Sequence, residues 1–503
     1  MDKKKSILNV SVSLTLKIIT LILNIWTKRV LIQSCGNEVN GLNALYLSII
    51  GFFSVAELGV GTAITFCMYK PIVEGNQTKV SALYGLFRRL YLLIGGFILI
   101  AGLLFAPFIS HFAKDYAELQ VNLHLTFILM LLSVVLTYLF GAKTALINAY
   151  KNNYISTAIT SGGIVLQNIL QIAALYITGS FVWYLVCRIL SALVQWIITE
   201  IIAGRKYHNI TKDKQKLDSE TKVELTKNIK AMFMHKIGGL LVNTLDSVVI
   251  SAFIGVTVLG EYNNYTTIMA SVGNIISFGL SSLTSTWGHL YAGKKELIQR
   301  YSEFSYLICF MAGVVFHLGY YAIIDNLIAI LYEEELIIAK NITFVITING
   351  FINFLRQNTL IFRDATGNFY YDRYKPLIEG TINIILSVFF VQWIGVIGAI
   401  LATILTNLFI CHIVEPYVLY KHAFHASPKK YYLQNYSFMI LFAMLLILLD
   451  KLMIALDSQW LELLINGCIA VGIAVIFCAI ILLLCKKEYK NFFGRKKQEK
   501  NFI

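Results

Sequence analysis

The chain has 503 residues, of which 57% are hydrophobic and only 14% are charged, and its formal net charge is +14. Soluble globular proteins average about 45–50% apolar and about 25% charged residues, and no compact core could hide the excess of apolar side chains found here. The composition therefore excludes soluble enzymes, secreted disulfide scaffolds and disordered chains. It is typical of a protein that crosses a membrane many times.

Long unbroken apolar runs, such as residues 92–105, 440–449 and 469–484, show how the chain crosses the membrane. The strands of a membrane barrel would alternate apolar and polar residues over about 10 positions, whereas a spanning helix needs about 20 apolar residues. The sequence therefore predicts an all-α polytopic membrane protein with about 14 transmembrane helices. The expected spans are residues 8–33, 41–67, 84–107, 121–147, 155–178, 181–203, 232–254, 262–289, 302–330, 341–362, 376–394, 396–419, 434–454 and 461–485.

The basic residues predict the orientation of these spans. An even number of spans places both termini on one side, and 34 of the 42 Lys and Arg residues fall on that side. Because positive residues are retained in the cytoplasm, we expect both termini to be cytoplasmic. The net charge is then a topology signal, and we expect no nucleic-acid partner.

Two segments resemble each other within the chain. Residues 36–46 read GNEVNGLNALY and residues 255–265 read GVTVLGEYNNY, with four identities in eleven positions, and each follows the first span of its half. We interpret this as a duplication, with two six-helix lobes related by a parallel repeat and two extra C-terminal helices. Parallel repeats with a substrate site between them are a recurrent transporter plan. The predicted parts are residues 1–203, a cytoplasmic linker at 204–230, residues 231–420, and residues 421–503.

Several ionisable side chains lie inside the predicted spans. Each costs about 3 kcal/mol or more in hydrocarbon, so they should face the bundle interior or a wet cavity. They either form a cationic cavity for an anionic substrate, with the acids as ion or proton sites, or pair to hold helices together; the excess of bases favours a phosphate-bearing substrate. The candidate substrate-binding bases are Lys17, Arg29, Arg188 and Arg356, and the candidate ion-coupling or structural acids are Glu57, Asp246 and Glu379.

Motifs for chemistry on a bound cofactor are missing from the sequence. The eight cysteines contain no C-x-x-C pair, the histidines show no H-E-x-x-H spacing, and no nucleotide-binding loop is present. We therefore expect no cofactor, no metal and no catalytic residue.

At the level of motifs, the chain from Arg29 to Phe424 resembles the Wzx-type polysaccharide flippases. These belong to the multidrug/oligosaccharidyl-lipid/polysaccharide (MOP) flippase superfamily. The matching segments are specific as a set rather than singly. They include AELGVGTAI at 56–64, YKPIVEGNQTKVSAL at 69–83, HKIGGLLVNTLDSVVISAFIG at 235–255 and FRDATGNFYYDRYKPLIEGTINIILSVFF at 362–390.

The resemblance implies transport rather than catalysis. The expected substrate is an undecaprenyl-diphosphate-linked oligosaccharide, moved from the inner to the outer leaflet of the bacterial plasma membrane for capsule or other surface polysaccharide. Expected partners are membrane lipids, a polysaccharide polymerase and chain-length proteins. By position, Lys70 and Arg363 would belong to the inner gate, together with His289, where relatives commonly have Asn.

Other functions remain open from the sequence. A drug or cation exporter of the same superfamily would favour an acid-dominated cavity, and here bases lead. A polysaccharide polymerase or ligase would need a large outer loop for its catalytic residues, and no expected outer loop exceeds roughly fifteen residues. A scaffold of a cell-wall complex is the third alternative, and it gives the buried charges no role.

Overall fold

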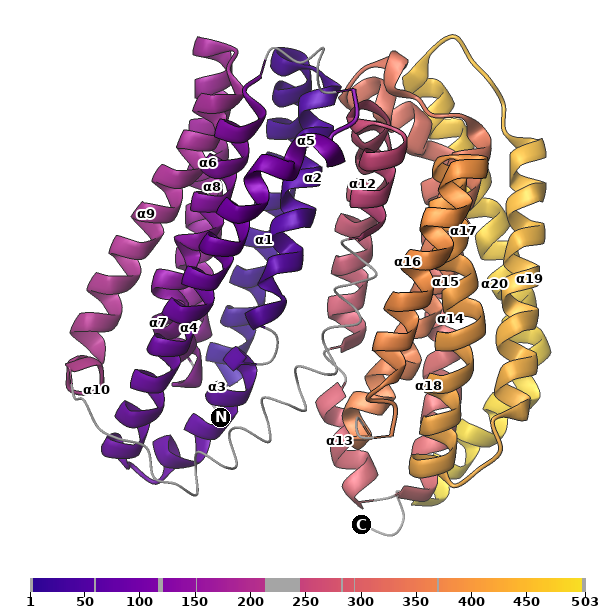
Figure 1. Ribbon diagram of the computed structural model, residues 1–503. Helices are drawn as coiled ribbons and strands as arrows, with labels where there is room; N and C mark the ends of the chain where they lie inside the picture. Colours follow the sequence, from indigo (N-terminus) through magenta and orange to yellow (C-terminus); the bar gives the residue numbers. More distant parts are fainter. Residues whose placement is uncertain are drawn as a thin grey trace. The chain divides into compact units, whose positions relative to one another are not determined.

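The structure is a computed structural model (Figure 1) in which the chain divides into two compact units. The first unit comprises residues 1–264 and 369–406, and the second comprises residues 265–368 and 407–503. Within the described part of the chain, all regular structure is helical, which confirms the predicted all-α class. The described residues are 3–57, 60–115, 121–150, 152–212, 245–281, 284–293, 295–368 and 371–499.

Among these residues, nine helices are long and apolar enough to cross a membrane, and each coincides with a predicted span. The other five predicted spans also fall on helices, although the one at 232–254 is described only from residue 245. The polytopic membrane fold is thus confirmed. The nine helices are Gln77–Phe112, Leu123–Ala149, Tyr154–Thr178, Phe181–Lys206, Leu297–Leu331, Lys375–Ile394, Val396–Phe424, Lys429–Leu452 and Gln459–Leu484.

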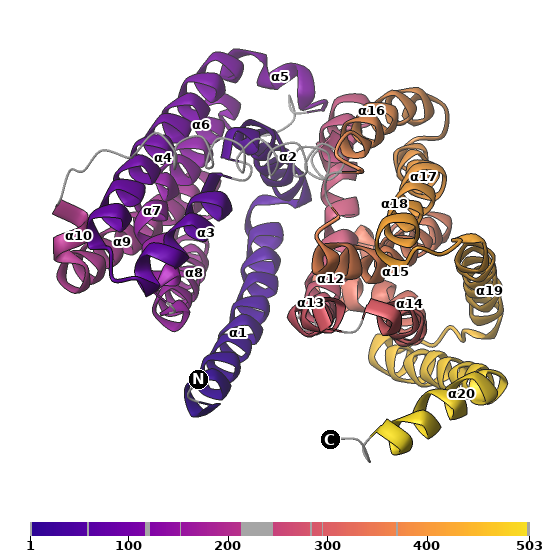
Figure 2. The same ribbon diagram turned by 90° about the horizontal axis from the view of Figure 1, so that it is seen from below.

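In the first unit, α4, α6, α7 and α9 lie side by side, and α8 packs against both α1 and α9 (Figure 2). Its helices are α1 (Lys3–Cys35), α2 (Asn37–Phe53), η1 (Ser54–Glu57), α3 (Val60–Val73), α4 (Gln77–Phe105), η2 (Ala106–Phe108), α5 (Ile109–Phe112), α6 (Leu123–Val135), α7 (Thr137–Ala149), α8 (Asn153–Thr178), α9 (Phe181–Lys206), α10 (His208–Lys212), residues 245–253, the start of α12 (Val256–Ser281), α16 (Lys375–Ile394) and α17 (Val396–Thr406).

The two segments that resemble each other in sequence have the same local structure. Gly36 directly precedes α2 with a φ of 90°, and Gly255 directly precedes α12 with a φ of 145°. Side chains rarely adopt a positive φ of this kind, so both turns favour glycine. The equivalent glycines thus occupy equivalent positions, which supports the predicted duplication.

The helices that follow these turns pack backbone against backbone. A Cβ added to Gly41 in α2 would lie 1.8 Å from the carbonyl oxygen of Val256. A Cβ added to Gly260 in α12 would lie 2.5 Å from the carbonyl oxygen of Asn37. Gly41 and Gly260 are equivalent in the two repeated segments, so the approach of α2 to α12 requires glycine at both positions.

Buried asparagines surround this crossing. The Asn40 amide nitrogen donates to Asn264 Oδ1 at 3.0 Å and to Asn37 Oδ1 at 3.1 Å, and the Asn37 amide nitrogen donates to the carbonyl oxygen of Thr257 at 3.1 Å. All three side chains are buried. Interhelical amide bonds and small residues are the usual means by which helices associate inside membranes.

The second unit is organised around α14 (Lys295–Leu331), which packs against α13, α15, α19 and α20. Phe310 stacks on Phe438 with ring centroids 3.8 Å apart, and Phe351 stacks on Phe442 at 3.7 Å. These stacks attach α19 to α14 and α15. The remaining elements are α13 (Thr284–Gly293), η4 (Glu334–Leu336), α15 (Lys340–Thr366), the π-helices η5 (Asn407–Cys411) and η6 (Tyr420–Phe424), α18 (His412–Leu419), α19 (Lys429–Leu452) and α20 (Gln459–Glu499).

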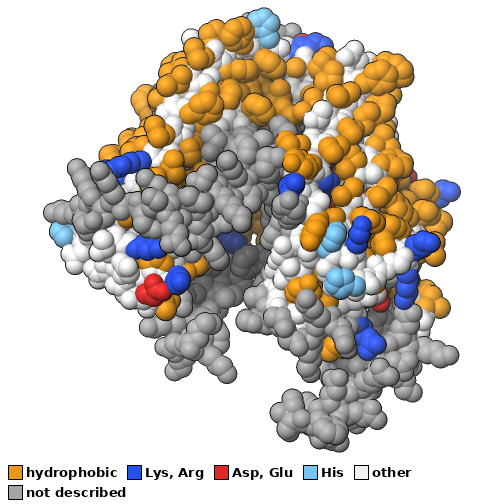
Figure 3. Space-filling view, turned by 60° about the horizontal axis from the view of Figure 1, so that its bottom comes forward, with side chains coloured by type: hydrophobic (Ala, Val, Ile, Leu, Met, Phe, Trp, Pro, Cys, Tyr) orange, Lys and Arg blue, Asp and Glu red, His pale blue; other side chains and the backbone are white. Residues whose placement is uncertain are grey.

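The surface has the character expected in a bilayer. Figure 3 shows hydrophobic side chains over the flanks, and Lys, Arg and His side chains at the end turned toward the viewer. Large apolar side chains are widely exposed, among them Trp183, Trp393 and Leu484, whose exposed fractions are 53%, 73% and 74%. Such exposure would be costly in water, and it fits contact with lipid.

We expect Gly41→Ala to destabilise the protein, because its methyl group would overlap the Val256 carbonyl and force α2 away from α12. Overpacking of this kind costs about 1–3 kcal/mol. Gly85→Ala is the matched control, since its Cβ would meet nothing within 4 Å. Thermal unfolding of the purified protein, followed by circular dichroism, should show a lower midpoint for Gly41→Ala only. Equal midpoints would contradict the tight crossing.

Candidate functional site

The site around Asp246 includes residues of a tight helical hairpin formed by α16 and α17. Gly395 lies between α16 and α17 with a φ of 60°, and a Cβ on Gly398 would lie 2.3 Å from the carbonyl oxygen of Phe390. The split predicted between spans 376–394 and 396–419 is therefore confirmed. Because the two helices approach so closely, the polar side chains on their facing sides are brought together.

Asp246 lies on the helical residues 245–253 and faces this hairpin. Its Oδ2 accepts a hydrogen bond from Thr403 Oγ1 at 2.9 Å, and its Oδ1 lies 3.4 Å from Ser387 Oγ. Among the described residues, no Lys or Arg side chain forms an ion pair with Asp246. The hydrogen-bond partners of the carboxylate are therefore neutral hydroxyl groups, an arrangement that suits uptake of a proton or a cation.

Asn383 completes this cluster. It is fully buried, and its amide nitrogen donates to Thr403 Oγ1 at 2.9 Å. Its Oδ1 is buried and has no hydrogen-bond partner among the described atoms. A carboxylate, two hydroxyls and an unpaired amide oxygen are the oxygen ligands that hard cations prefer. We call Asp246, Asn383, Ser387 and Thr403 the Asp246 cluster.

Glu57, the predicted acid of the second span, lies at a break in that span. Glu57 is the last residue of η1, and α3 begins at Val60. Tyr91 donates to Glu57 Oε1 at 2.6 Å, and Tyr138 donates to Oε2 at 2.7 Å. Both carboxylate oxygens thus have phenol partners from α4 and α7, which links the helix break to two neighbouring helices.

Glu379 and Arg356 are both paired. Lys375 Nζ lies 2.6 Å from Glu379 Oε2, and both side chains are buried in the first turns of α16. Arg356 on α15 bonds both carboxylate oxygens of Glu415 at 2.7–3.0 Å and Asn407 Oδ1 at 3.2 Å. Asn407 begins the π-helix η5, and such local widenings of a helix often mark functional positions.

The remaining predicted bases have different environments. Arg188 is half-buried on α9, and none of the described carboxylates forms an ion pair with it. Arg29 is half-buried and Lys17 is exposed, both on α1. The neighbouring Lys28 donates to the carbonyl oxygen of Asn263 at 3.1 Å. The predicted substrate-binding roles of these bases remain predictions.

The predicted inner-gate residues lie at the ends of helices. Lys70 is exposed in the last turn of α3 and lies 3.9 Å from Glu74. Arg363 is buried in the last turn of α15, and its Nη2 donates to Asp364 at 3.3 Å. His289 belongs to α13, and its side chain lies outside the described part of the chain. The gate assignment stays a prediction.

Several contributors were not singled out from the sequence. Glu415, the partner of Arg356, lies within a predicted span. The sequence signal for this pair was an acid in one span and an Arg in another. The neutral members of the Asp246 cluster gave no signal, because hydroxyl and amide residues are common in spans. In the described ranges, no three His, Cys, Asp or Glu side chains gather in a metal-binding group.

We expect Glu415→Gln to destabilise the second unit, because the partly buried Arg356 guanidinium then lacks its buried carboxylate partner. Breaking one partner of a buried ion pair costs about 3–5 kcal/mol. Combining it with Arg356→Gln should recover much of that loss, because no charge then remains unpaired. Unfolding free energies in detergent would measure this, with the exposed Glu335→Gln as control. Additive losses in the double variant would contradict the pairing.

Comparison with known proteins identifies the fold. No family model and no curated protein sequence matches this chain. Its structure is similar to the lipid II flippase MurJ in an inward closed conformation, with a TM-score of 0.67, 15% identity, and 95% of this chain and 99% of that chain covered.

Two transporters of the MOP superfamily are also similar. An inward-facing multidrug resistance MATE family transporter gives a TM-score of 0.66 at 15% identity, covering 82% of this chain and 99% of that one. A MOP superfamily transporter from Pyrococcus furiosus gives 0.55 at 12% identity, covering 84% and 96%. The chain therefore has the fold of the MOP superfamily transporters.

Proposed function

We propose that this protein is a flippase for an undecaprenyl-diphosphate-linked oligosaccharide, which it moves from the inner to the outer leaflet of the bacterial plasma membrane. A diphosphate with a hydrophilic glycan cannot cross about 30 Å of hydrocarbon unaided. The head group would travel through a polar cavity of the protein while the polyprenyl tail stays in lipid. Both termini would lie in the cytoplasm, and a polysaccharide polymerase and chain-length proteins would use the product.

The extent of the match to MurJ carries this proposal. Its 95% coverage leaves about 25 of 503 residues unmatched, whereas α19 and α20 alone span residues 429–499. Most of these two helices therefore have counterparts in the MurJ structure. The match to the MATE transporter leaves about 91 residues unmatched, enough to omit both helices. The presence of α19 and α20 thus favours a lipid-linked substrate over the substrate of a drug exporter.

The basic residues support an anionic head group. Arg188 has no acid partner among the described residues, so an anion could bind its guanidinium without first breaking an ion pair. Guanidinium groups bind phosphate with two parallel hydrogen bonds. Arg356 is the weaker candidate, because Glu415 already neutralises it. We therefore assign the main contact with the diphosphate to Arg188, with Arg29 and Lys17 on α1 as further bases.

The Asp246 cluster would couple transport to an ion. Its carboxylate has neutral partners only among the described residues, and its buried Asn383 oxygen is unpaired. A cation or a proton would satisfy both groups. Binding would draw the helical residues 245–253 toward the α16–α17 hairpin, and release would loosen them. Transporters commonly place coupling ions at such interrupted helices.

An exporter and an enzyme are the alternatives. An exporter would take a cationic substrate, and Arg188, which has no acid partner in the described part of the chain, disfavours one. A polymerase or ligase would need a catalytic segment outside the membrane on the outer side. There, the longest connection between described helices, from residue 113 to 122, has ten residues. This leaves little room for such a segment.

The test is leaflet transfer in liposomes. The purified protein would be reconstituted with a fluorescent undecaprenyl-diphosphate oligosaccharide, and a membrane-impermeant quencher would report its exposure with and without a membrane potential. We expect transfer that depends on the protein and increases with the potential. No transfer by folded protein in either condition would overturn the flippase proposal.

In the same liposomes, Asp246→Asn should remove the dependence of transfer on an imposed ion gradient, because the neutral amide cannot hold the coupling cation. Thr403→Val should weaken that dependence, since it removes one oxygen ligand. Asp457→Asn, in the exposed connection between α19 and α20, is the matched control. Unchanged gradient dependence in Asp246→Asn would reject the coupling role.

Arg188→Gln should lower the affinity for the diphosphate substrate at least tenfold, a loss of about 1.4 kcal/mol or more, because a charge-assisted contact disappears. Arg205→Gln, an exposed residue in the last turn of the same helix, should leave affinity unchanged. Competition by inorganic diphosphate in a substrate-binding assay would measure both variants. Equal affinities would exclude Arg188 from the head-group site.

A further inference from the structure

A polar cavity of about 560 Å³ lies in the first unit where α1 ends and α2 begins. Small-molecule sites typically measure about 300–1,000 Å³, and a single water occupies only about 30 Å³. The cavity is therefore far larger than a cation requires. We call it the α1–α2 pocket; its lining residues include Ser34, Glu38, Asp115, Asn122, Ser180 and Phe181.

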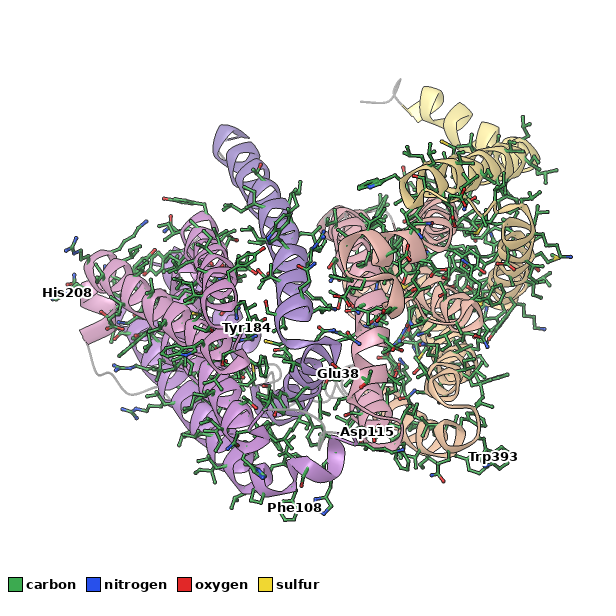
Figure 4. The ribbon with its side chains drawn as sticks, turned by 90° about the horizontal axis from the view of Figure 1, so that it is seen from above. Glu38, Phe108, Asp115, Tyr184, His208 and Trp393 are labelled. Atoms are coloured by element: carbon green, nitrogen blue, oxygen red, sulfur yellow. The ribbon has the colours of Figure 1, made fainter. Side chains whose placement is uncertain are left out.

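Two carboxylates give the α1–α2 pocket strong hydrogen-bond acceptors. Glu38 and Asp115 both line the pocket at this end of the unit (Figure 4), and neither forms an ion pair with a described residue. Their carboxylates lie over the glycines of the repeat: a Cβ on Gly36 would be 2.6 Å from Glu38, and one on Gly255 would be 2.5 Å from Asp115. Glycine at these turns leaves the space that the carboxylates occupy.

The same pocket also offers donors. The helices α2, α6, α9 and α12 all begin at or beside lining residues, and the first N–H groups of a helix have no partner within it. Neither Gly36 before α2 nor Ser180 before α9 provides a side-chain cap. Asn122 uses its oxygen to cap α6, and its amide nitrogen makes no hydrogen bond to the described residues.

This mixture of groups selects the class of ligand. An anion such as phosphate would suit the helix N-termini but would be repelled by two carboxylates. A cation would suit the carboxylates but would be repelled by the positive ends of four helices. A neutral molecule with many hydroxyl groups satisfies both donors and acceptors.

We propose that the α1–α2 pocket binds a sugar residue of the transported glycan, an inference that rests on the proposed flippase function. The distribution of Lys and Arg residues along the sequence places the end of the unit that holds the pocket on the outer side. Arg29 lies six residues before Cys35, and Arg188 lies seven after Phe181, so both lie about 9–11 Å deeper along their helices at 1.5 Å per residue. A diphosphate at that depth would place the following sugars in the pocket.

The test measures sugar binding directly, without transport. Methyl glycosides of glucose, galactose and N-acetylglucosamine would be offered to the full chain in nanodiscs, and saturation-transfer NMR would report their binding. We expect at least one to bind, and the Glu38→Gln, Asp115→Asn double variant to weaken it at least tenfold. Asn also tolerates the positive φ of 67° at position 115. Val182→Trp, which fills the pocket, should abolish binding.

The controls separate the possible outcomes. Glu333→Gln, an exposed acid outside the pocket, should bind sugar normally. If no glycoside binds the wild type, or if the double variant binds equally well, the proposal is wrong. The liposome assay runs in parallel: sugar binding without lipid transfer would reject the flippase function but keep the pocket. Lipid transfer without sugar binding would keep the flippase function but reject the pocket proposal.

Discussion

Hydrocarbon cannot satisfy a polar group, and this one constraint explains most of the side-chain arrangement in the membrane. Arg356 has Glu415, Glu379 has Lys375, and Glu57 has two tyrosines. The Arg356 and Glu57 contacts connect helices that are distant in sequence, whereas Lys375 and Glu379 pair within α16. The residues that depart from the rule are then informative, because their cost must be offset by something that binds.

Asp246 and Arg188 are such departures. Each lacks an oppositely charged partner among the described residues, and both belong to the first unit. Their surroundings differ in a way that suits different ligands. Asp246 has two hydroxyl neighbours within hydrogen-bond reach, which suits a small cation, whereas Arg188 offers a planar donor that suits phosphate. The chemistry of the neighbours separates an ion site from a substrate site.

The sequence predicted the spans well because hydropathy depends on length and composition, which survive any detail of packing. It did not predict the interruptions within spans. Residues 41–67 contain the break at η1, and residues 396–419 contain the π-helix η5, although each reads as one apolar run. A window average hides such breaks, since the apolar residues on either side outweigh them.

Pairing was beyond the sequence for a different reason. Whether Arg356 meets Glu415 depends on the rotation of two helices about their axes, and a linear sequence with no alignment does not encode that rotation directly. The repeat was an exception. Gly36 and Gly255, and then Gly41 and Gly260, were matched by sequence, and the structure places each pair in equivalent positions because turns and close contacts constrain glycine strongly.

The membrane potential favours the proposed movements of both ligands, the diphosphate and the cation. The membrane potential is negative inside, and each charge that crosses 100 mV gains about 2.3 kcal/mol. The potential favours the outward movement of the negatively charged diphosphate. It also favours the inward movement of a cation through the Asp246 cluster. Both half-cycles would then be favoured by one field, with no need for a nucleotide-binding site. If the cation instead moved outward with the substrate, its charge would cancel the electrical gain.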